Sequence, residues 1–256
     1  MGLDQQQAED IWRPFLTWLA AAPQDFSVEN AVRIASMPAR HFWDAAFLRQ
    51  HAPSLVVADD RPGAPEGHFF LAVDRSQGGQ CLHGYRSAWL PASLLQPEQQ
   101  PYLADALFAS TRHWGMSLHF NKGLAGAPAE EVAAAKDTAM HPAVLDAFAL
   151  AISASHGPPA FPNITGHAPD LHMARRNASA ISKAMDAMLT VVPDAGSYVA
   201  ESDFFHPAWQ HAFWGANYPR LAAVKRHYDP AGLFFVHHGV GSEEWSADGF
   251  TRLTGR

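Results

Sequence analysis

The sequence predicts an α+β fold, with an antiparallel sheet covered by helices. Three observations support this prediction. Long stretches with a helical repeat of apolar residues are mixed with short strand-like runs, some strand-like runs follow each other directly, and no regular strand–helix–strand alternation is present. The chain has 256 residues, which is enough to bury a core without disulfides or structural metals.

The helices are predicted from apolar residues that recur about one turn apart. In the opening helix, Ile11, Phe15 and Trp18 form such a stripe, and Pro23 ends it. In the longest helix, Ile181 and Met185 lie on the apolar side. The predicted helices after the first span residues 102–114, 129–139, 142–155, 169–190, 206–214 and 218–227.

Strands are predicted where apolar and polar residues alternate, or where a short apolar run is bounded by turn residues. The clearest alternation places Met116, Leu118 and Phe120 on one face of a strand. His119 and Asn121 lie on the other face, which either lines a pocket or is simply exposed to solvent. The predicted strands span residues 68–74, 81–90, 116–121, 196–200 and 233–237.

The composition excludes some classes of function. The formal net charge is -7 and only 17% of residues are charged, so the basic surface of a general nucleic-acid binder is missing. No apolar run reaches the roughly 18 residues of a membrane span, and the first residues lack the pattern of a signal peptide. We therefore expect no nucleic-acid partner, no membrane association and, by default, a cytoplasmic location.

The spacing of cysteine and histidine argues against a metal site. Cys81 is the one cysteine in the sequence, so neither an internal disulfide nor a cysteine-rich zinc site can form. His206 and His211 are five residues apart and miss the i, i+4 spacing of a helical zinc pair. His237 and His238 are adjacent in a predicted strand, so they should point to opposite faces. We expect no metal ion.

The segment from residue 196 to residue 235 carries the most specific pattern in the chain. It reads Gly-Ser-Tyr-Val-Ala-Glu-Ser-Asp-Phe-Phe at 196–205, Trp-Gly-Ala-Asn-Tyr-Pro-Arg-Leu at 214–221 and Val-Lys-Arg-His-Tyr-Asp-Pro at 224–230. This order resembles the carboxyl-terminal segment of the berberine-bridge-enzyme-like FAD-linked oxidases, in the vanillyl-alcohol-oxidase and p-cresol-methylhydroxylase superfamily. Residues 84–90 and 118–126 resemble the substrate domain of that family more loosely.

The resemblance implies a substrate-binding (cap) domain at 1–195 and a berberine-bridge-type helical segment at 196–256. It also implies FAD as the cofactor and a small organic substrate, oxidised by hydride transfer to the flavin. Similar family members begin with a separate FAD-binding domain that this sequence lacks, so we expect an incomplete portion that is inactive alone. Two alternatives stay open: a non-catalytic remnant or binding module, and a subunit that completes a site with a separately encoded FAD domain.

By the same resemblance, Tyr198 and Glu201 are the candidate catalytic residues. Strict alternation puts them on opposite faces of an extended strand, so a bulge or a strand end is needed for both to line one site. His119 and Asn121 are the candidate substrate-pocket residues.

The candidate cofactor contacts are Trp214, Gly215, Asn217 and Tyr218. Asn217 offers both a donor and an acceptor, which match the edge of a flavin ring. Gly215 lets the backbone approach a neighbouring group closely, because it has no Cβ. For Tyr218, packing within the fold is the alternative role.

Overall fold

A computed structural model describes residues 3–29, 32, 34, 36–74, 79–121, 124, 127–161 and 163–253 of the chain. The chain divides into two compact units, Met1–Gly78 and Gly79–Arg256. The predicted domain border between residues 195 and 196 lies inside the second unit and stays a prediction. Over the described ranges, no helix is both long and apolar enough to cross a membrane.

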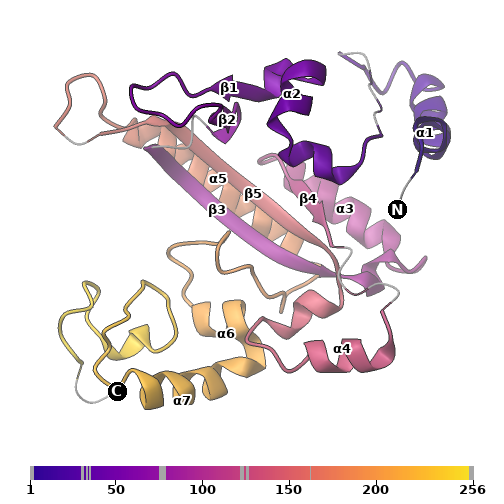
Figure 1. Cartoon of the computed structure of the whole chain (residues 1–256). Helices are drawn as coiled ribbons and strands as arrows, with labels where there is room; N and C mark the ends of the chain where they lie inside the picture. Colours follow the sequence, from indigo (N-terminus) through magenta and orange to yellow (C-terminus); the bar gives the residue numbers. More distant parts are fainter. Residues whose placement is uncertain are drawn as a thin grey trace. The chain divides into compact units, whose positions relative to one another are not determined.

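The first unit combines short helices with a small antiparallel strand pair (Figure 1). Its elements are α1 (Gln5–Ala20), α2 (Ala45–His51), β1 (Val56–Ala58) and β2 (Phe69–Leu71), with 3-10 turns at Ala39–Trp43 and Pro53–Leu55. Asp4 begins α1 with a capping box, in which Asp4 and Gln7 each accept the backbone N–H of the other. The predicted opening helix is thereby confirmed.

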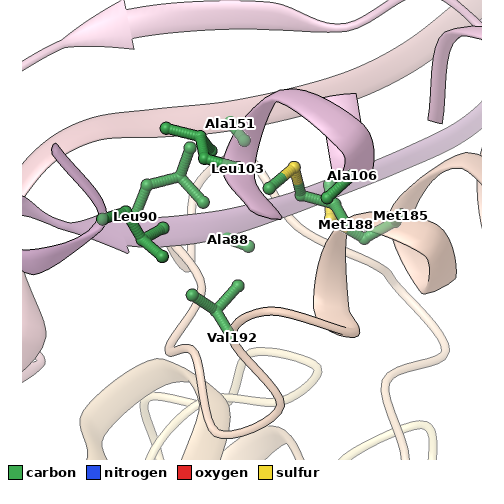
Figure 2. Close-up of a cluster of buried hydrophobic side chains, with 9 residues drawn as sticks. Ala88, Leu90, Leu103, Ala106, Ala151, Met185, Met188 and Val192 are labelled. Carbon is green, nitrogen blue, oxygen red and sulfur yellow. The ribbon is translucent and has the colours of Figure 1, made fainter. Parts of the chain in front are cut away.

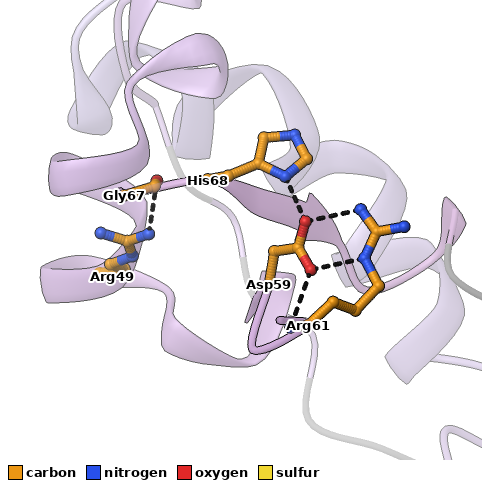
Figure 3. Close-up of polar contacts among 5 residues, drawn as sticks. All are labelled: Arg49, Asp59, Arg61, Gly67 and His68. Atoms are coloured by element: carbon orange, nitrogen blue, oxygen red, sulfur yellow. Dashed lines mark hydrogen bonds and ion pairs between the residues drawn. The ribbon is translucent and has the colours of Figure 1, made fainter. Parts of the chain in front are cut away.

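An ion-pair network closes the loop between β1 and β2 (Figure 3). The two carboxylate oxygens of Asp59 each accept from the Arg61 guanidinium at 2.7 Å, and Asp59 Oδ2 lies 2.5 Å from His68 Nδ1. The side-chain hydrogen bonds from Arg61 hold the pKa of Asp59 well below its usual range. The carboxylate stays charged and ties the two ends of the loop together.

The second unit is built on a three-stranded antiparallel sheet with the order β3-β5-β4 (Figure 1). The strands are β3 (Gln80–Pro91), β4 (Ser117–Phe120) and β5 (Ala147–Pro159). The helices are α3 (Gln100–Thr111), α4 (Ala129–Ala135), α5 (Leu171–Leu189), α6 (Trp209–Trp214) and α7 (Tyr218–Tyr228), with 3-10 turns at Ala92–Leu95, Pro142–Leu145, Gly215–Asn217 and Ser242–Glu244. The predicted α+β class with an antiparallel sheet is confirmed.

Helices α3 and α5 pack on the sheet and bury its main core (Figure 2). Figure 1 shows α5 running along β3 and β5. The buried side chains come from β3, β5, α3, α5 and the turns beside them: Ala88, Leu90, Leu94, Leu103, Ala106, Ala151, Met185, Met188 and Val192. The predicted helix that contains Met185 is therefore the main cover of the sheet.

Strand β3 presents two different faces, as the period of two requires. Every second residue from Arg86 to Leu90 packs toward α3 and α5. The alternate residues, Tyr85, Ser87 and Trp89, contact the segment that follows residue 195. One strand thus supports both the core and a second, separate layer of contacts.

The predicted helix over residues 142–155 is wrong. A 3-10 turn covers Pro142–Leu145, and the residues from Ala147 onward form the central strand β5. This strand pairs with β3 on one side and β4 on the other, and its first half is almost fully buried. Periodicity cannot separate such a buried strand from a buried helix, so the strand pairing decides the outcome.

The predicted strand over residues 233–237 is also wrong. The Asp229 carboxylate accepts two backbone N–H groups of this stretch at 2.8 and 3.1 Å, so they are not available to a ladder. His237 and His238 accordingly do not point to opposite faces of a strand. Their rings stack with centroids 3.8 Å apart, and His238 has a φ of +56°.

We expect Leu90→Ala to lower the free energy of unfolding by roughly 2–5 kcal/mol, as a buried cavity would. Leu90 has 0% exposed surface, whereas Leu95, in the adjacent turn, is 45% exposed. Leu95→Ala is therefore the matched control, with an expected change within about 0.5 kcal/mol. Urea unfolding measures both, and equal losses would contradict the assignment of the core.

Candidate functional site

The segment that follows residue 195 runs along the edge strand β3. The backbone N–H of Trp89 donates to the Gly196 carbonyl at 2.9 Å. The buried hydroxyl oxygens of Ser87 and Ser197 are 2.8 Å apart. These contacts cover a sheet edge that would otherwise leave backbone groups unpaired. They also fix which residues of the segment lie beside Trp89.

Tyr198 and Glu201 lie in a turn, so the predicted strand over residues 196–200 is wrong. The Tyr198 N–H donates to Ser87 Oγ at 3.2 Å, and the Glu201 N–H donates to the Tyr198 carbonyl at 2.9 Å. The expectation of opposite strand faces does not apply to a turn. The Tyr85 hydroxyl donates to the Glu201 carboxylate at 3.0 Å, and burial, reinforced by this bond, raises the pKa of Tyr85 to about 12.

A pocket of about 200 Å³ lies beside Tyr198. Its walls come from β3, the loop at residues 139–144, the Tyr198 turn and α6. The lining is mostly aromatic or apolar and includes Trp89, His141, Ser197, Tyr198, Phe213 and Trp214. Of the candidate site residues, the structure brings Tyr198 and Trp214 together here.

The His141 ring lies between two glycines of the segment. A Cβ at Gly196 would lie 2.5 Å from the ring, and a Cβ at Gly215 would lie 2.9 Å from its Nε2. Its Nδ1 accepts from the Ala143 N–H at 3.1 Å. Burial lowers the pKa of His141, and the nearby His211 adds to this effect, so the ring is neutral at pH 7. Gly215 does permit a close approach, and the neighbour is His141.

Asn217 and Tyr218 use their polar groups inside the chain. The Asn217 amide donates to the carbonyl oxygens of Thr138 at 3.1 Å and Met140 at 2.7 Å, which holds the loop that lines the pocket. The Tyr218 hydroxyl donates to the Glu243 carboxylate at 2.6 Å. Burial, followed by this bond, raises the pKa of Tyr218. Both residues thus stabilise the segment in which they occur.

His119 and Asn121 do not meet at this pocket. The Asn121 amide donates to the carbonyl oxygens of Val144 at 2.7 Å and Ala147 at 3.3 Å, so it fixes the turn that leads into β5. His119 is exposed on β4. Asn121 therefore acts on the pocket only through Val144, which lines it.

Stacked rings join the residues after the Tyr198 turn to the carboxyl-terminal loop. His237 stacks on Phe204 at 4.0 Å and on His238 at 3.8 Å, and His238 stacks on Trp209 of α6 at 5.2 Å. Burial is the main cause that lowers the pKa of His238 and of His206. Within the described residues, no group of three or more potential ligands could hold a metal ion.

Residues 197–241 match the sequence profile of the family described as Berberine and berberine like. Because of this similarity, residues 197–241 are called the berberine-like segment below. The chain is 49% identical over 65 residues to an uncharacterized FAD-linked oxidoreductase of Arthroderma benhamiae, and 50% identical over 62 residues to the FAD-linked oxidoreductase ZEB1 of Gibberella zeae. These alignments cover 25% and 24% of this chain, but 11% of each relative.

The fold matches solved structures over nearly the whole chain. The TM-scores to the crystal structures of the VAO-type flavoproteins MtVAO615 and MtVAO713 from Myceliophthora thermophila are 0.57 and 0.59, at 23% and 20% identity. The matches cover 97% and 96% of this chain, and 39% and 37% of those chains. The berberine-like segment and the sheet before it thus have the fold of part of a VAO-type flavoprotein.

Sequence reasoning missed three residues around the berberine-like segment: Ser87, Trp89 and His141. For Ser87 and Trp89 a signal was present, because the alternation in residues 84–90 separates them from the core-facing residues. For His141 the sequence contains no such signal. Its role depends on two glycines that are distant in the sequence and come together only in the fold.

We expect Gly196→Ala to lower the free energy of unfolding by roughly 1–3 kcal/mol, because the added Cβ overlaps the His141 ring. In a His141→Ala background the same change should cost less than about 0.5 kcal/mol, since the ring is gone. A double-mutant cycle by urea unfolding measures this coupling. A cost of Gly196→Ala that stays the same in both backgrounds would rule out the ring as the obstacle.

We also expect the chain to lose stability as the pH falls below 6.5, the ordinary pKa of histidine. The folded chain lowers the pKa of His141, His206 and His238, so the unfolded chain binds more protons below pH 6.5 and unfolding becomes easier. Above that pH the stabilising contribution is complete.

Melting temperatures on both sides of pH 6.5 measure this effect. His238→Gln should reduce the difference between the two pH values, whereas His119→Gln, at an exposed position, should leave it unchanged. The same pH dependence in both variants and in the unaltered chain would contradict the role of His238.

Proposed function

We propose that this chain is the substrate-binding and carboxyl-terminal part of an FAD-dependent oxidoreductase that oxidises a small organic substrate by hydride transfer to the flavin. The observation that carries the proposal is that Tyr198 and Trp214 of the berberine-like segment line one pocket against β3. The match to relatives named FAD-linked oxidoreductases supports the reaction class.

The described residues fit the ring end of FAD in part. Bound FAD would supply the hydride acceptor. Trp214 lines the pocket, and Asn217 keeps its carbonyl oxygen for a donor because its amide N–H groups are used inside the chain. The sequence has no Gly-x-Gly-x-x-Gly loop to hold a diphosphate. We therefore propose that a separate FAD-binding domain or polypeptide holds that end.

In this proposal, Tyr198 acts on the substrate directly. Its backbone is fixed by Ser87, and its ring lies 6.2 Å from the Trp89 ring. The Tyr198 hydroxyl would hydrogen-bond to the substrate oxygen and stabilise the charge that develops there. Glu201 would contribute by holding the Tyr198 turn against Tyr85.

A binding module without flavin chemistry is the second candidate function. One observation favours it: the described residues of this chain form the pocket walls without help from another chain. Binding of a ligand in the absence of flavin is then possible, and it can be measured separately from oxidation.

We expect a fusion of this chain with the portion of MtVAO615 that it does not cover to retain FAD and to show flavin reduction by small alcohols. Tyr198→Phe in the fusion should retain FAD but slow flavin reduction roughly 100-fold, because a charge-stabilising donor is lost. Flavin content after gel filtration and stopped-flow absorbance measure the two effects.

Tyr228→Phe is the matched control for this experiment, because it removes a hydroxyl from a tyrosine that is 80% exposed on α7. It should change neither flavin content nor rate. A fusion that folds but holds no FAD would contradict the cofactor proposal. An unchanged rate in Tyr198→Phe would contradict the role of Tyr198.

A further inference from the structure

We propose that the pocket beside Tyr198 binds an uncharged aromatic molecule of about one ring that carries a hydrogen-bond acceptor. The inference deepens the proposed function, on which it rests where the ligand is called a substrate. The binding itself requires no flavin, so the two proposals can fail independently.

The shape of the lining selects a planar ring. Aromatic side chains reach the pocket from three separate elements: Trp89 from β3, Tyr198 from the turn, and Phe213 and Trp214 from α6. A ring that enters among these side chains can make edge-to-face or offset contacts with them, which contribute more affinity than the buried area alone. The backbone bonds of Trp89 and Tyr198 hold two of these rings in place before any ligand arrives.

The electrostatics of the lining exclude a charged ligand. None of the described residues that line the pocket is Asp, Glu, Lys or Arg. The Ser197 hydroxyl is already bonded to Ser87, and burial keeps His141 neutral. A carboxylate or an ammonium group would lose its hydration here without gaining a partner of opposite charge, and a sugar has more hydroxyl groups than the few polar atoms of this lining can bond.

The size of the pocket and two buried, unpartnered donors of its lining complete the description of the ligand. An apolar cavity of about 150 Å³ already holds benzene, so a pocket of about 200 Å³ takes one substituted ring. The indole N–H of Trp89 and the Nε2 atom of His141 are both buried and have no hydrogen-bond partner among the described residues. Because His141 Nδ1 accepts from the Ala143 N–H, the proton of the neutral ring is on Nε2, which makes it a second donor. A buried donor of this kind is costly until an acceptor reaches it, which is why the ligand should carry one.

Calorimetric titration of the full chain without flavin tests the proposal with four probes: acetophenone, benzoate, methyl glucoside and riboflavin. We expect acetophenone to bind, and benzoate, which has a similar shape but a charge, to bind at least roughly tenfold more weakly. Methyl glucoside should not bind, and riboflavin should not displace acetophenone. Comparable binding of benzoate or glucoside, or displacement by riboflavin, would overturn the proposal.

Matched variants place the binding in this pocket. Val199 lines the pocket and is 45% exposed, whereas Val224 is 47% exposed and lies on α7 outside the lining. Val199→Trp should fill the pocket and abolish acetophenone binding, and Val224→Trp should leave it unchanged. Equal binding by both variants would overturn the assignment.

The donor is tested with Trp89→Phe, which keeps a ring but removes the indole N–H. Acetophenone should bind roughly three- to tenfold more weakly to this variant, whereas α-methylstyrene, which has the same shape and no acceptor, should bind as before. An equal loss for both probes would overturn the role of the N–H. Flavin retention by the MtVAO615 fusion is a separate readout, so its failure leaves these titrations interpretable.

Discussion

The contact between the edge of strand β3 and residues 196–201 is the interaction on which the candidate site depends. Trp89 donates to Gly196 through the backbone, Ser87 bonds to Ser197, and the Tyr85 hydroxyl reaches Glu201. Each such bond contributes on the order of 1 kcal/mol, but a buried group that loses its partner costs more than that. Because the same strand supplies the core on its other face, the core fixes the position of this contact.

A second tie joins the loop at residues 138–144 to the berberine-like segment, and it is mostly steric. The His141 ring occupies the space that two missing Cβ atoms leave, and Asn217 binds the carbonyl groups just before it. Residues that the motif marks as cofactor contacts thus also hold the pocket wall. A change at Asn217 would affect the fold of the wall as well as any contact with a flavin, so flavin retention alone cannot reveal its role.

The parts of the fold that the sequence predicted are those where one element has one buried side. Helix α5 is the clearest case, because its apolar stripe faces the sheet and the opposite side faces solvent. The sequence pattern predicts a helix where strand β5 lies, because this strand is buried on both faces over its first half and therefore lacks the alternation of polar and apolar residues. The strands expected at 196–200 and 233–237 fail because Ser87 and Asp229 bind their N–H groups, a competition that no local pattern reveals.

In the candidate site too, some residues can be predicted from the sequence and others cannot. Tyr198 and Trp214 could be found because the family pattern includes them, and the structure places both at one pocket. His141 belongs to no pattern in its own neighbourhood, because its environment is made by Gly196 and Gly215. A residue whose role depends on packing against residues far away in the sequence is therefore the hardest to predict from the sequence.

The pocket side of the second unit relies on neutral contacts, which sets how it responds to change. The ion pairs found among the described residues of this unit lie outside the pocket lining. Two examples are Arg86 with Asp186 on the helix side of the sheet, and Arg220 with Asp137, a largely exposed pair that contributes little to stability. Around Tyr198, close packing and hydrogen bonds take their place, and the Glu201 carboxylate accepts from the uncharged Tyr85 hydroxyl. Such a site is insensitive to salt but responds strongly to one added methyl group or to one added proton on a buried imidazole.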